Sequence, residues 1–262
     1  MMQERRIDKL ELKMPDGQML RGDFHYTPPT LPDLNAEPSP VVVFAHGFGS
    51  VRNGDKALAV ADECARRGWA FATCDFRGHG ESDGKMIELL GSRLIEDLDA
   101  ITGEAARRAR GKLFLFGSSM GGWASAWFAA RYPGRVAACA FVAPAFCFIE
   151  FMRLTDAERE AWQRAGRHRF RNEFVDVEIG YGLAAEAEWF KFGTLAKQFR
   201  TPSIIFHGTA DDIVPHSISV EFAERCAAEI DLNLIEFGDH RLNEQKDKLA
   251  RAACDFFNIE CD

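Results

Sequence analysis

The stretch Gly117-Ser118-Ser119-Met120-Gly121 decides both the fold and the chemistry that this chain is expected to have. It follows a short apolar run at residues 112–116 and opens a helical-looking segment at 123–132. Strand, glycine-flanked serine and helix form the setting in which G-x-S-x-G becomes a nucleophile elbow. A side chain at either glycine would collide with a neighbouring strand or helix in this strained turn. Only Ser119 fits the register, because Ser118 would need a glycine at Phe116; the alternative is a glycine-rich turn without chemistry.

A second stretch, Gly80-Glu81-Ser82-Asp83-Gly84, also matches G-x-S-x-G. It follows the polar loop Arg77-Gly78-His79, with no strand running into it and no helix starting after it. Context therefore decides between the two serines, and we expect Ser82 to be a loop residue.

Composition indicates one globular domain, or one core domain with an insertion. The chain has 262 residues, of which 47% are hydrophobic and 27% charged, and its net charge is −8. This charge argues against binding to nucleic acid. No apolar run approaches the roughly 20 residues of a membrane-spanning helix. Because no apolar stretch follows residues 1–6, we expect no secretory signal and a cytoplasmic enzyme.

The cysteines favour a reduced protein without a metal. Their number is odd and no C-x-x-C pair occurs, which excludes a zinc ribbon and argues against a disulfide framework. We expect most to be small core residues, and we expect neither a metal nor an organic cofactor. The seven are Cys64, Cys74, Cys139, Cys147, Cys226, Cys254 and Cys261.

Hydrophobic patterning predicts an α/β fold with a doubly wound, mostly parallel sheet and helices on both faces. Residues 6–13 and 19–26 are expected to form an antiparallel pair of strands around a turn. Strands and helices then alternate. The expected strands are 41–45, 69–75, 113–116, 136–142, 203–207 and 232–237, and the expected helices are 55–67, 93–110, 119–132, 217–229 and 244–257.

Residues 145–200 interrupt this alternation. The segment is rich in aromatic residues and partly helical, so we expect a small helical lid inserted after the sixth strand, between core regions 1–144 and 201–262. A peripheral excursion that never touches substrate is the alternative. Among its aromatic residues, Phe146 and Trp189 are predicted to bind substrate. The segment also carries a basic cluster, which is either a solvated face or a contact for an anionic substrate group: Arg164, Arg167, His168, Arg169 and Arg171.

A serine nucleophile needs a base, and the base needs an acid that orients it. His240, in the turn that leaves the last expected strand, is the predicted base. His216 is a poorer choice, because it lies only a few residues from the candidate acids. The acid is expected after the preceding strand, where Asp211 and Asp212 are adjacent and spacing does not separate them. Asp239 is a weaker rival because it adjoins the base.

The oxyanion hole requires two backbone N–H groups aimed at one point. Met120 follows the nucleophile at a helix N-terminus, where the helix dipole favours negative charge. Phe48, in the loop His46-Gly47-Phe48-Gly49 after the first parallel strand, is the second predicted donor. His46 and Gly47 are predicted to line the substrate site, with His46 shaping the loop through a hydrogen bond; a plain turn is the alternative.

Four blocks together make the chain resemble an α/β-hydrolase over nearly its whole length: residues 46–49, 75–82, 117–121, and 207–211 with Val214-Pro215. The resemblance implies that the acid is the fourth residue after His207, which selects Asp211. It also implies that the block beginning at Asp75 braces loops beside the site. The ending Gly238-Asp239-His240-Arg241-Leu242 resembles small-lid serine esterases and acyl-thioesterases, including mitochondrial depalmitoylating and acyl-glucuronide-cleaving types.

These residues predict a serine hydrolase that cleaves carboxylic ester or thioester bonds of small acyl substrates through an acyl-enzyme intermediate. A peptidase, a perhydrolase or a C–C hydrolase on the same fold is the alternative within enzymes. A dehalogenase or epoxide hydrolase is disfavoured, because those place an aspartate where Ser119 stands. A non-catalytic ligand receptor is the alternative of another class. The expected partner of the protein is a small acyl ester or thioester substrate, and we expect the protein to be a monomer or homodimer.

Overall fold

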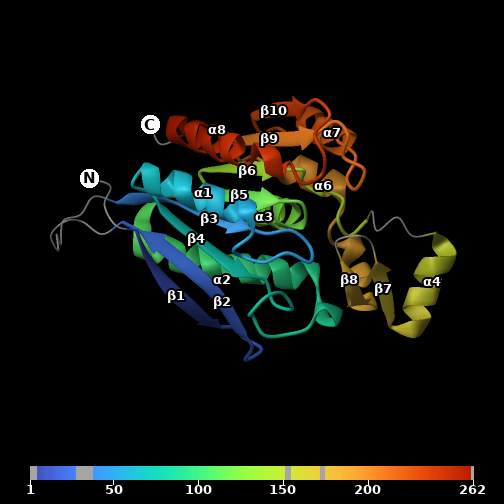
Figure 1. The fold of residues 1–262 in the computed structure, drawn as a ribbon. Coiled ribbons are helices and arrows are strands. Elements are labelled where there is room, and N and C mark those ends of the chain that lie inside the picture. Colours follow the sequence, from blue (N-terminus) through green and yellow to red (C-terminus); the bar gives the residue numbers. More distant parts are fainter. Residues whose placement is uncertain (1–4, 28–37, 151–154, 172–174, 261–262) are drawn as a thin grey trace.

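The computed structural model describes residues 5–27, 38–150, 155–171 and 175–260, and they build a layered α/β protein (Figure 1). One sheet of eight strands has the order β1-β2-β4-β3-β5-β6-β9-β10. β1 and β2 pair antiparallel, as do β2 and β4, and all other pairs are parallel. This confirms the mostly parallel sheet. The strands are β1 (Arg6–Lys13), β2 (Met19–Tyr26), β3 (Ser39–Ala45), β4 (Ala70–Asp75), β5 (Arg110–Ser118), β6 (Ala138–Val142), β9 (Ser203–Gly208) and β10 (Ile230–Ile235).

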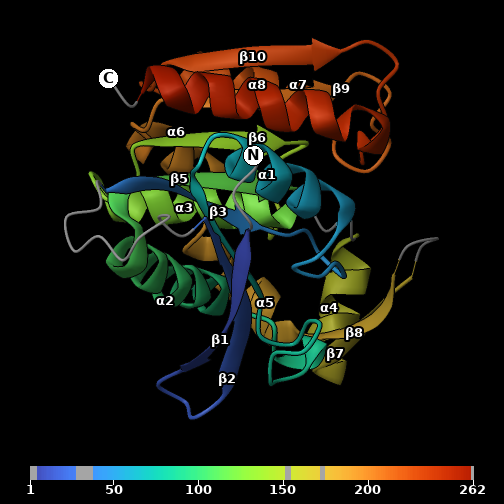
Figure 2. The same cartoon turned by 60° about the vertical axis from the view of Figure 1, so that its left-hand side comes forward.

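Helices cover both faces of the sheet (Figures 1 and 2). α1 (Asp55–Arg66) and α8 (Lys246–Ile259) pack on one face. The opposite face carries α2 (Gly91–Ala109), α3 (Met120–Arg131), α6 (Phe192–Gln198) and α7 (Ser217–Arg225). The central strands are therefore buried on both sides, which explains why residues 41–45 are continuously apolar rather than alternating.

One predicted helix end is displaced. The helix expected at 93–110 ends at Ala109, and Arg110 takes the left-handed conformation with φ 62°. Gly111 belongs to β5, where an added Cβ would lie 2.2 Å from the carbonyl oxygen of Ser39. The glycine thus allows two strands to approach closely and does not cap the helix.

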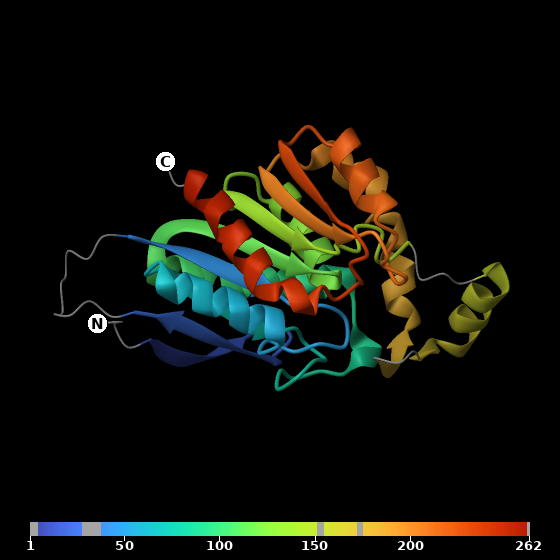
Figure 3. The same cartoon turned by 45° about the horizontal axis from the view of Figure 1, so that its top comes forward.

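The insertion between β6 and β9 contains helices, as expected, and in addition a pair of strands. The elements that the structure describes in it are α4 (Asp156–Ala165), β7 (Arg167–Arg171), β8 (Asp176–Gly180), α5 (Tyr181–Ala185), the 3-10 turn η2 (Glu186–Glu188) and α6. β7 and β8 form an antiparallel hairpin, and with α4 they extend from the body at the end of the sheet away from the termini (Figure 3).

The basic cluster lies largely on this hairpin. Along β7 the side chains alternate, so that Arg167, Arg169 and Arg171 are exposed. Arg169 pairs with Asp176 on β8, with Nε 2.6 Å from the carboxylate. Arg167 and Arg171 also lie within 4.0 Å of carboxylates on β8, so the cluster is in large part a solvated face.

Two further observations concern the whole described chain. No helix in the described ranges combines the length and the apolar character that a membrane crossing requires. The six cysteines that the structure describes are free thiols, and five of them are buried. Cys261 lies outside the described residues.

Candidate active site

Ser119 occupies a strained turn between β5 and α3. Its φ of 53° and ψ of −116° lie outside the regions that side-chain-bearing residues prefer. The flanking glycines make the turn possible. A Cβ on Gly121 would lie 2.1 Å from the carbonyl oxygen of Ala45, and one on Gly117 would lie 2.6 Å from Gly121 O. The collision expected from the sequence is therefore present on both sides of the serine.

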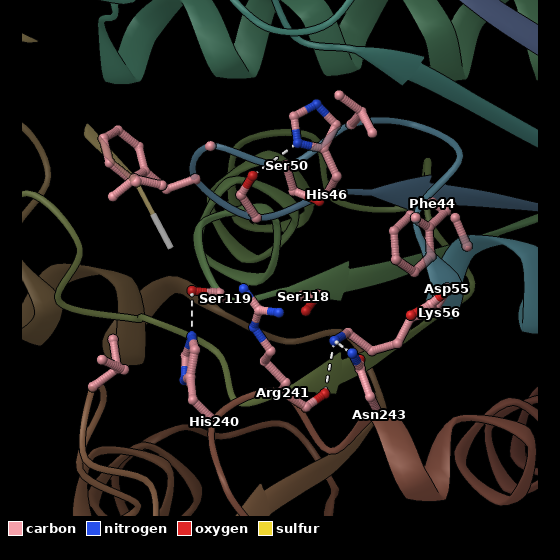
Figure 4. Close-up of a pocket in the computed structure, with 18 residues that line it drawn as sticks. Phe44, His46, Ser50, Asp55, Lys56, Ser118, Ser119, His240, Arg241 and Asn243 are labelled. Atoms are coloured by element: carbon pink, nitrogen blue, oxygen red, sulfur yellow. Dashed lines mark hydrogen bonds between the residues drawn. The ribbon is translucent and has the colours of Figure 1, made fainter. Parts of the chain in front are cut away.

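The structure brings Ser119, His240 and Asp211 into one hydrogen-bonded chain (Figure 4). His240 Nε2 lies 3.1 Å from Ser119 Oγ, and its Nδ1 lies 2.7 Å from Asp211 Oδ2. The three residues come from turns after β10, β5 and β9, whose carboxyl ends share one edge of the sheet. His216 lies at the N-terminal end of α7 instead.

The surroundings of Asp211 separate it from its two rivals. Its side chain is fully buried, and its Oδ1 accepts the backbone N–H groups of Ile213 at 2.9 Å and Val214 at 2.8 Å. Asp212 is exposed. Asp239 uses Oδ1 to accept the N–H of Leu242 at 2.7 Å. Of the three carboxylates, Asp211 is the one bonded to His240.

The hydrogen bonds also determine the charge of Asp211 and the tautomer of His240. Burial opposes ionisation of Asp211, but hydrogen bonds from His207 and His240 outweigh it and lower the pKa of the carboxyl well below 3.8. An ionised carboxylate only accepts hydrogen bonds, so Nδ1 of His240 must carry the proton. Nε2 then has a free lone pair facing Ser119 and can accept the hydroxyl proton.

His207 is a member of the site that sequence reasoning did not single out. This fully buried side chain lies with Nε2 3.1 Å from Asp211 Oδ2 and 3.0 Å from Val214 O, and with Nδ1 2.7 Å from Ser219 Oγ. Both Nε2 partners are acceptors, so Nε2 donates and Nδ1 accepts from the Ser219 hydroxyl. The only sequence signal was its position four residues before Asp211.

The loop after β3 faces the serine across a narrow gap. A Cβ on Gly47 would lie 3.4 Å from Ser119 Cβ, so the glycine lets the loop backbone approach the nucleophile. His46 shapes this loop: Nδ1 donates to Gly47 O at 2.8 Å and Nε2 accepts the N–H of Phe76 at 3.1 Å. Burial lowers the pKa of His46 to about 4, so the ring is neutral. Both ring nitrogens are occupied by backbone groups.

The two predicted oxyanion donors belong to the loop after β3 and to the start of α3. Phe48 belongs to the loop that lines the cavity beside the serine. Met120 is the first residue of α3, where backbone N–H groups have no acceptor within the helix. The amides of both residues remain the predicted donors.

The block at residues 75–82 supports the loop between β3 and α1 through hydrogen bonds and an ion pair. Asp75 accepts the N–H of Arg52 at 2.7 Å and that of Glu81 at 3.0 Å, and pairs with the Arg52 guanidinium. Gly80 is required here, because a Cβ would lie 2.3 Å from the Asp75 carboxyl carbon. Ser82 is buried, donates to Asp75 O and accepts from Arg21 N at 2.8 Å. It is a structural loop residue, as its context predicted.

A cavity of about 320 Å³ opens beside Ser119 and His240. The loop after β3, the N-terminal turn of α1 and the turn after β10 form its walls, and Val175 closes it from the insertion. Two predicted substrate-binding residues lie elsewhere. Phe146 is fully buried in the core, where its ring stacks on Phe222 at 4.0 Å. Trp189 is 67% exposed and lies outside the cavity wall.

The cavity has a polar end formed by Asp55, Lys56, Arg241 and Asn243 (Figure 4). Within residues 5–27, 38–150, 155–171 and 175–260, no three His, Cys, Asp or Glu side chains are grouped so that they could hold a metal ion. The site itself supplies a serine hydroxyl bonded to an imidazole, a carboxylate bonded to that imidazole, and a cavity beside them.

An eight-stranded doubly wound sheet with a serine elbow after β5 defines an α/β-hydrolase. The chain belongs to the family described as serine aminopeptidase, S33, whose model matches residues 36–167. It is 31% identical over 229 residues to the mitochondrial palmitoyl-protein thioesterase ABHD10 of Bos taurus, covering 84% of this chain and 74% of that protein.

Two solved structures share the fold. Alpha/beta hydrolase domain-containing protein 10 from mouse superimposes with a TM-score of 0.77 and 25% identity, covering 96% of this chain and 98% of that one. Est1E from Butyrivibrio proteoclasticus, solved with ferulic acid bound, gives a TM-score of 0.81 at 20% identity over the same shares of the two chains.

Proposed function

We propose that this protein is a serine hydrolase that cleaves carboxylic ester or thioester bonds of small acyl substrates. The observation that carries the proposal is the hydrogen-bonded chain from Asp211 through His240 to Ser119, which ends at a cavity. An alcohol is a poor nucleophile near neutral pH, and an imidazole within hydrogen-bonding distance removes that limitation.

The mechanism follows from the proton positions. Ser119 Oγ forms a bond to the acyl carbon while its proton passes to His240 Nε2, and the Phe48 and Met120 amides hold the oxyanion. The C–O or C–S bond then breaks, and His240 returns the proton to the leaving group. Water next adds to the acyl-enzyme and gives a proton to His240. The acid departs as Ser119 regains that proton, which restores the starting state.

Asp211 stays ionised throughout. It orients the imidazole and stabilises the imidazolium that forms twice in each cycle. His207 acts on the reaction only through Asp211 and is a positioning residue. Thioester and ester hydrolysis are favoured over peptide hydrolysis because the relative from Bos taurus, which covers 84% of this chain, is named a palmitoyl-protein thioesterase.

Residues 145–200 are proposed to cover this cavity as a lid. The contact that supports this role is Val175, which lines the cavity and packs against Gly49 so tightly that a Cβ there would lie 2.2 Å from Val175 Cγ1. The cytoplasmic location stays a prediction from the sequence.

The test is hydrolysis of paired oxygen and sulfur esters of equal acyl length, together with an aminoacyl anilide. Ser119→Ala should lower kcat by several orders of magnitude and abolish labelling by a fluorophosphonate probe. Ser118→Ala is the matched control and should retain activity within about tenfold, because Ser118 does not occupy the nucleophile position of the elbow. Near-full ester hydrolysis by Ser119→Ala, or an unlabelled native protein, would contradict the proposal.

A further inference from the structure

Lys56 is a cation of the cavity wall whose two hydrogen-bond partners are neutral. Lys56, in the first turn of α1, places Nζ 2.7 Å from the backbone oxygen of Arg241 and 3.2 Å from Asn243 Oδ1 (Figure 4). Both acceptors are neutral. An ammonium group has three N–H donors, so these contacts leave one donor uncommitted.

The electrostatics of Lys56 are those of an uncompensated charge. Among the residues that the structure describes, no carboxylate lies within 4.0 Å of its ammonium nitrogen. Burial, and then the positive charge of Arg241, lower the pKa of Lys56 to about 8, and the more distant Asp239 and Asp55 do not offset this. Partly buried charges in proteins normally have a counter-charge, because desolvation is costly. Lys56 lines the same cavity as the nucleophile, so a ligand in that cavity can supply the counter-charge.

We propose that Lys56 binds a carboxylate of the substrate, so that this enzyme acts on ester or thioester substrates that carry an acidic group. The inference rests on the proposed function and names its substrate class. The same cavity is lined by Ser119, His240 and Lys56, so one small ligand reaches both the nucleophile and the ammonium.

A purely structural role for Lys56 makes a different prediction. Its two hydrogen bonds tie α1 to the turn that carries His240, across 185 residues of sequence. Loss of that tie would misplace His240 and slow every substrate equally. Loss of a carboxylate site would slow acidic substrates selectively, so the ratio between an acidic substrate and its neutral isostere separates the two roles.

The experiment uses two isosteric pairs. Monomethyl adipate and methyl adipamate place a carboxylate or an amide on the acyl side. The hexanoate esters of glycolic acid and glycolamide place it on the leaving group. We expect the native enzyme to prefer the acid of one pair by about tenfold or more in kcat/KM, because a site built for one polar group rejects an analogue that lacks it. The pair that shows the preference identifies which side of the scissile bond faces Lys56.

Lys56→Met should remove this preference, and Lys56→Arg should keep part of it. Lys248→Met is the control for net charge, since Lys248 is an exposed lysine of α8, and it should leave the ratio unchanged. An unchanged ratio in Lys56→Met, or a native enzyme without preference for either acid, would overturn the inference while ester hydrolysis stands.

A binding measurement covers the case in which none of the four esters is cleaved. Calorimetry of adipate and glycolate against the corresponding amides needs no turnover. Acid binding that exceeds amide binding and disappears in Lys56→Met would support the carboxylate site even though the proposed hydrolysis had failed. Equal binding of acids and amides would refute the site itself.

Discussion

Substitution of Asp211 by asparagine tests the site through its proton positions, because the structure dictates how the amide must lie. The Oδ1 position receives two backbone N–H groups, from Ile213 and Val214. Only the amide oxygen can occupy that position, so the NH₂ group must replace Oδ2. There it would face Nδ1 of His240 and Nε2 of His207 with a donor in place of an acceptor.

His207 can adapt to this change, but His240 cannot do so and remain a base. His207 can keep its proton on Nε2 and donate it to Val214 O, which lies 3.0 Å away. His240 can keep its hydrogen bond only by moving its proton to Nε2. That nitrogen then presents N–H to Ser119 and cannot accept the hydroxyl proton. We therefore expect Asp211→Asn to lower kcat by about 10⁴-fold, the loss typical of a triad in the wrong tautomer, or about 5 kcal/mol in activation free energy.

The assay is kcat/KM for an ester substrate, with Asp212→Asn as the matched control. Asp212 is the adjacent, exposed carboxylate, and its variant should lose less than about tenfold, because it removes the same charge outside the hydrogen-bonded chain. Circular dichroism and the Tm should show that both variants are folded. Folded Asp211→Asn with activity within tenfold of the native enzyme would refute the assignment of the acid, and so would an equal loss in both variants.

Two other predictions follow from buried histidines. His207→Met should lower kcat about tenfold or more at unchanged KM, whereas His207→Gln, of similar size but with an N–H donor, should recover most of this loss; equal losses in the two variants would show that the hydrogen bond to Asp211 is unimportant. Burial lowers the pKa values of His25 and His46 to about 4 and that of His79 to about 3. Between pH 6.5 and 4 the unfolded chain therefore binds protons that the folded protein does not. Because of this difference, the free energy of unfolding falls as the pH is lowered. Urea unfolding near pH 5 should show a slope of about 4 kcal/mol per pH unit from these three groups, reduced by about a third in His25→Phe, and a flat profile would contradict it.

The sequence located the sheet and the elbow well because both depend on local signals. Apolar runs of five residues flanked by glycine or polar turns have few alternatives to buried strands, and Gly117 and Gly121 are needed for contacts within one turn. Element ends were less accurate. The last strand was expected at 232–237 and runs from Ile230 to Ile235, because pairing with β9 rather than apolar content sets its limits.

The two strands of the insertion were not predicted, because β7 resembles a charged run. In β7, Arg-His-Arg-Phe-Arg has the two-residue period of a half-exposed strand, but its basic content obscured that period.

Packing also decides which aromatic residues reach a ligand. Phe146 fills the core against Phe222, whereas Trp189 remains largely exposed, and residue type alone does not distinguish the two. Lys56 lay in an ordinary helical pattern, and its role depends on contacts with residues 185 or more positions away.

The direction of each proton in the site follows from one carboxylate. Because Asp211 only accepts, both imidazoles that contact it must donate through the nitrogen that faces it. His207 then accepts from Ser219, and His240 accepts from Ser119. The chain of hydrogen bonds thus runs inward from two serine hydroxyls, one on α7 and one at the elbow, to a single acceptor. Reversing either chain would leave an unprotonated ring nitrogen facing the carboxylate, acceptor against acceptor, so the fold holds the base in the tautomer that the nucleophile requires before any substrate binds.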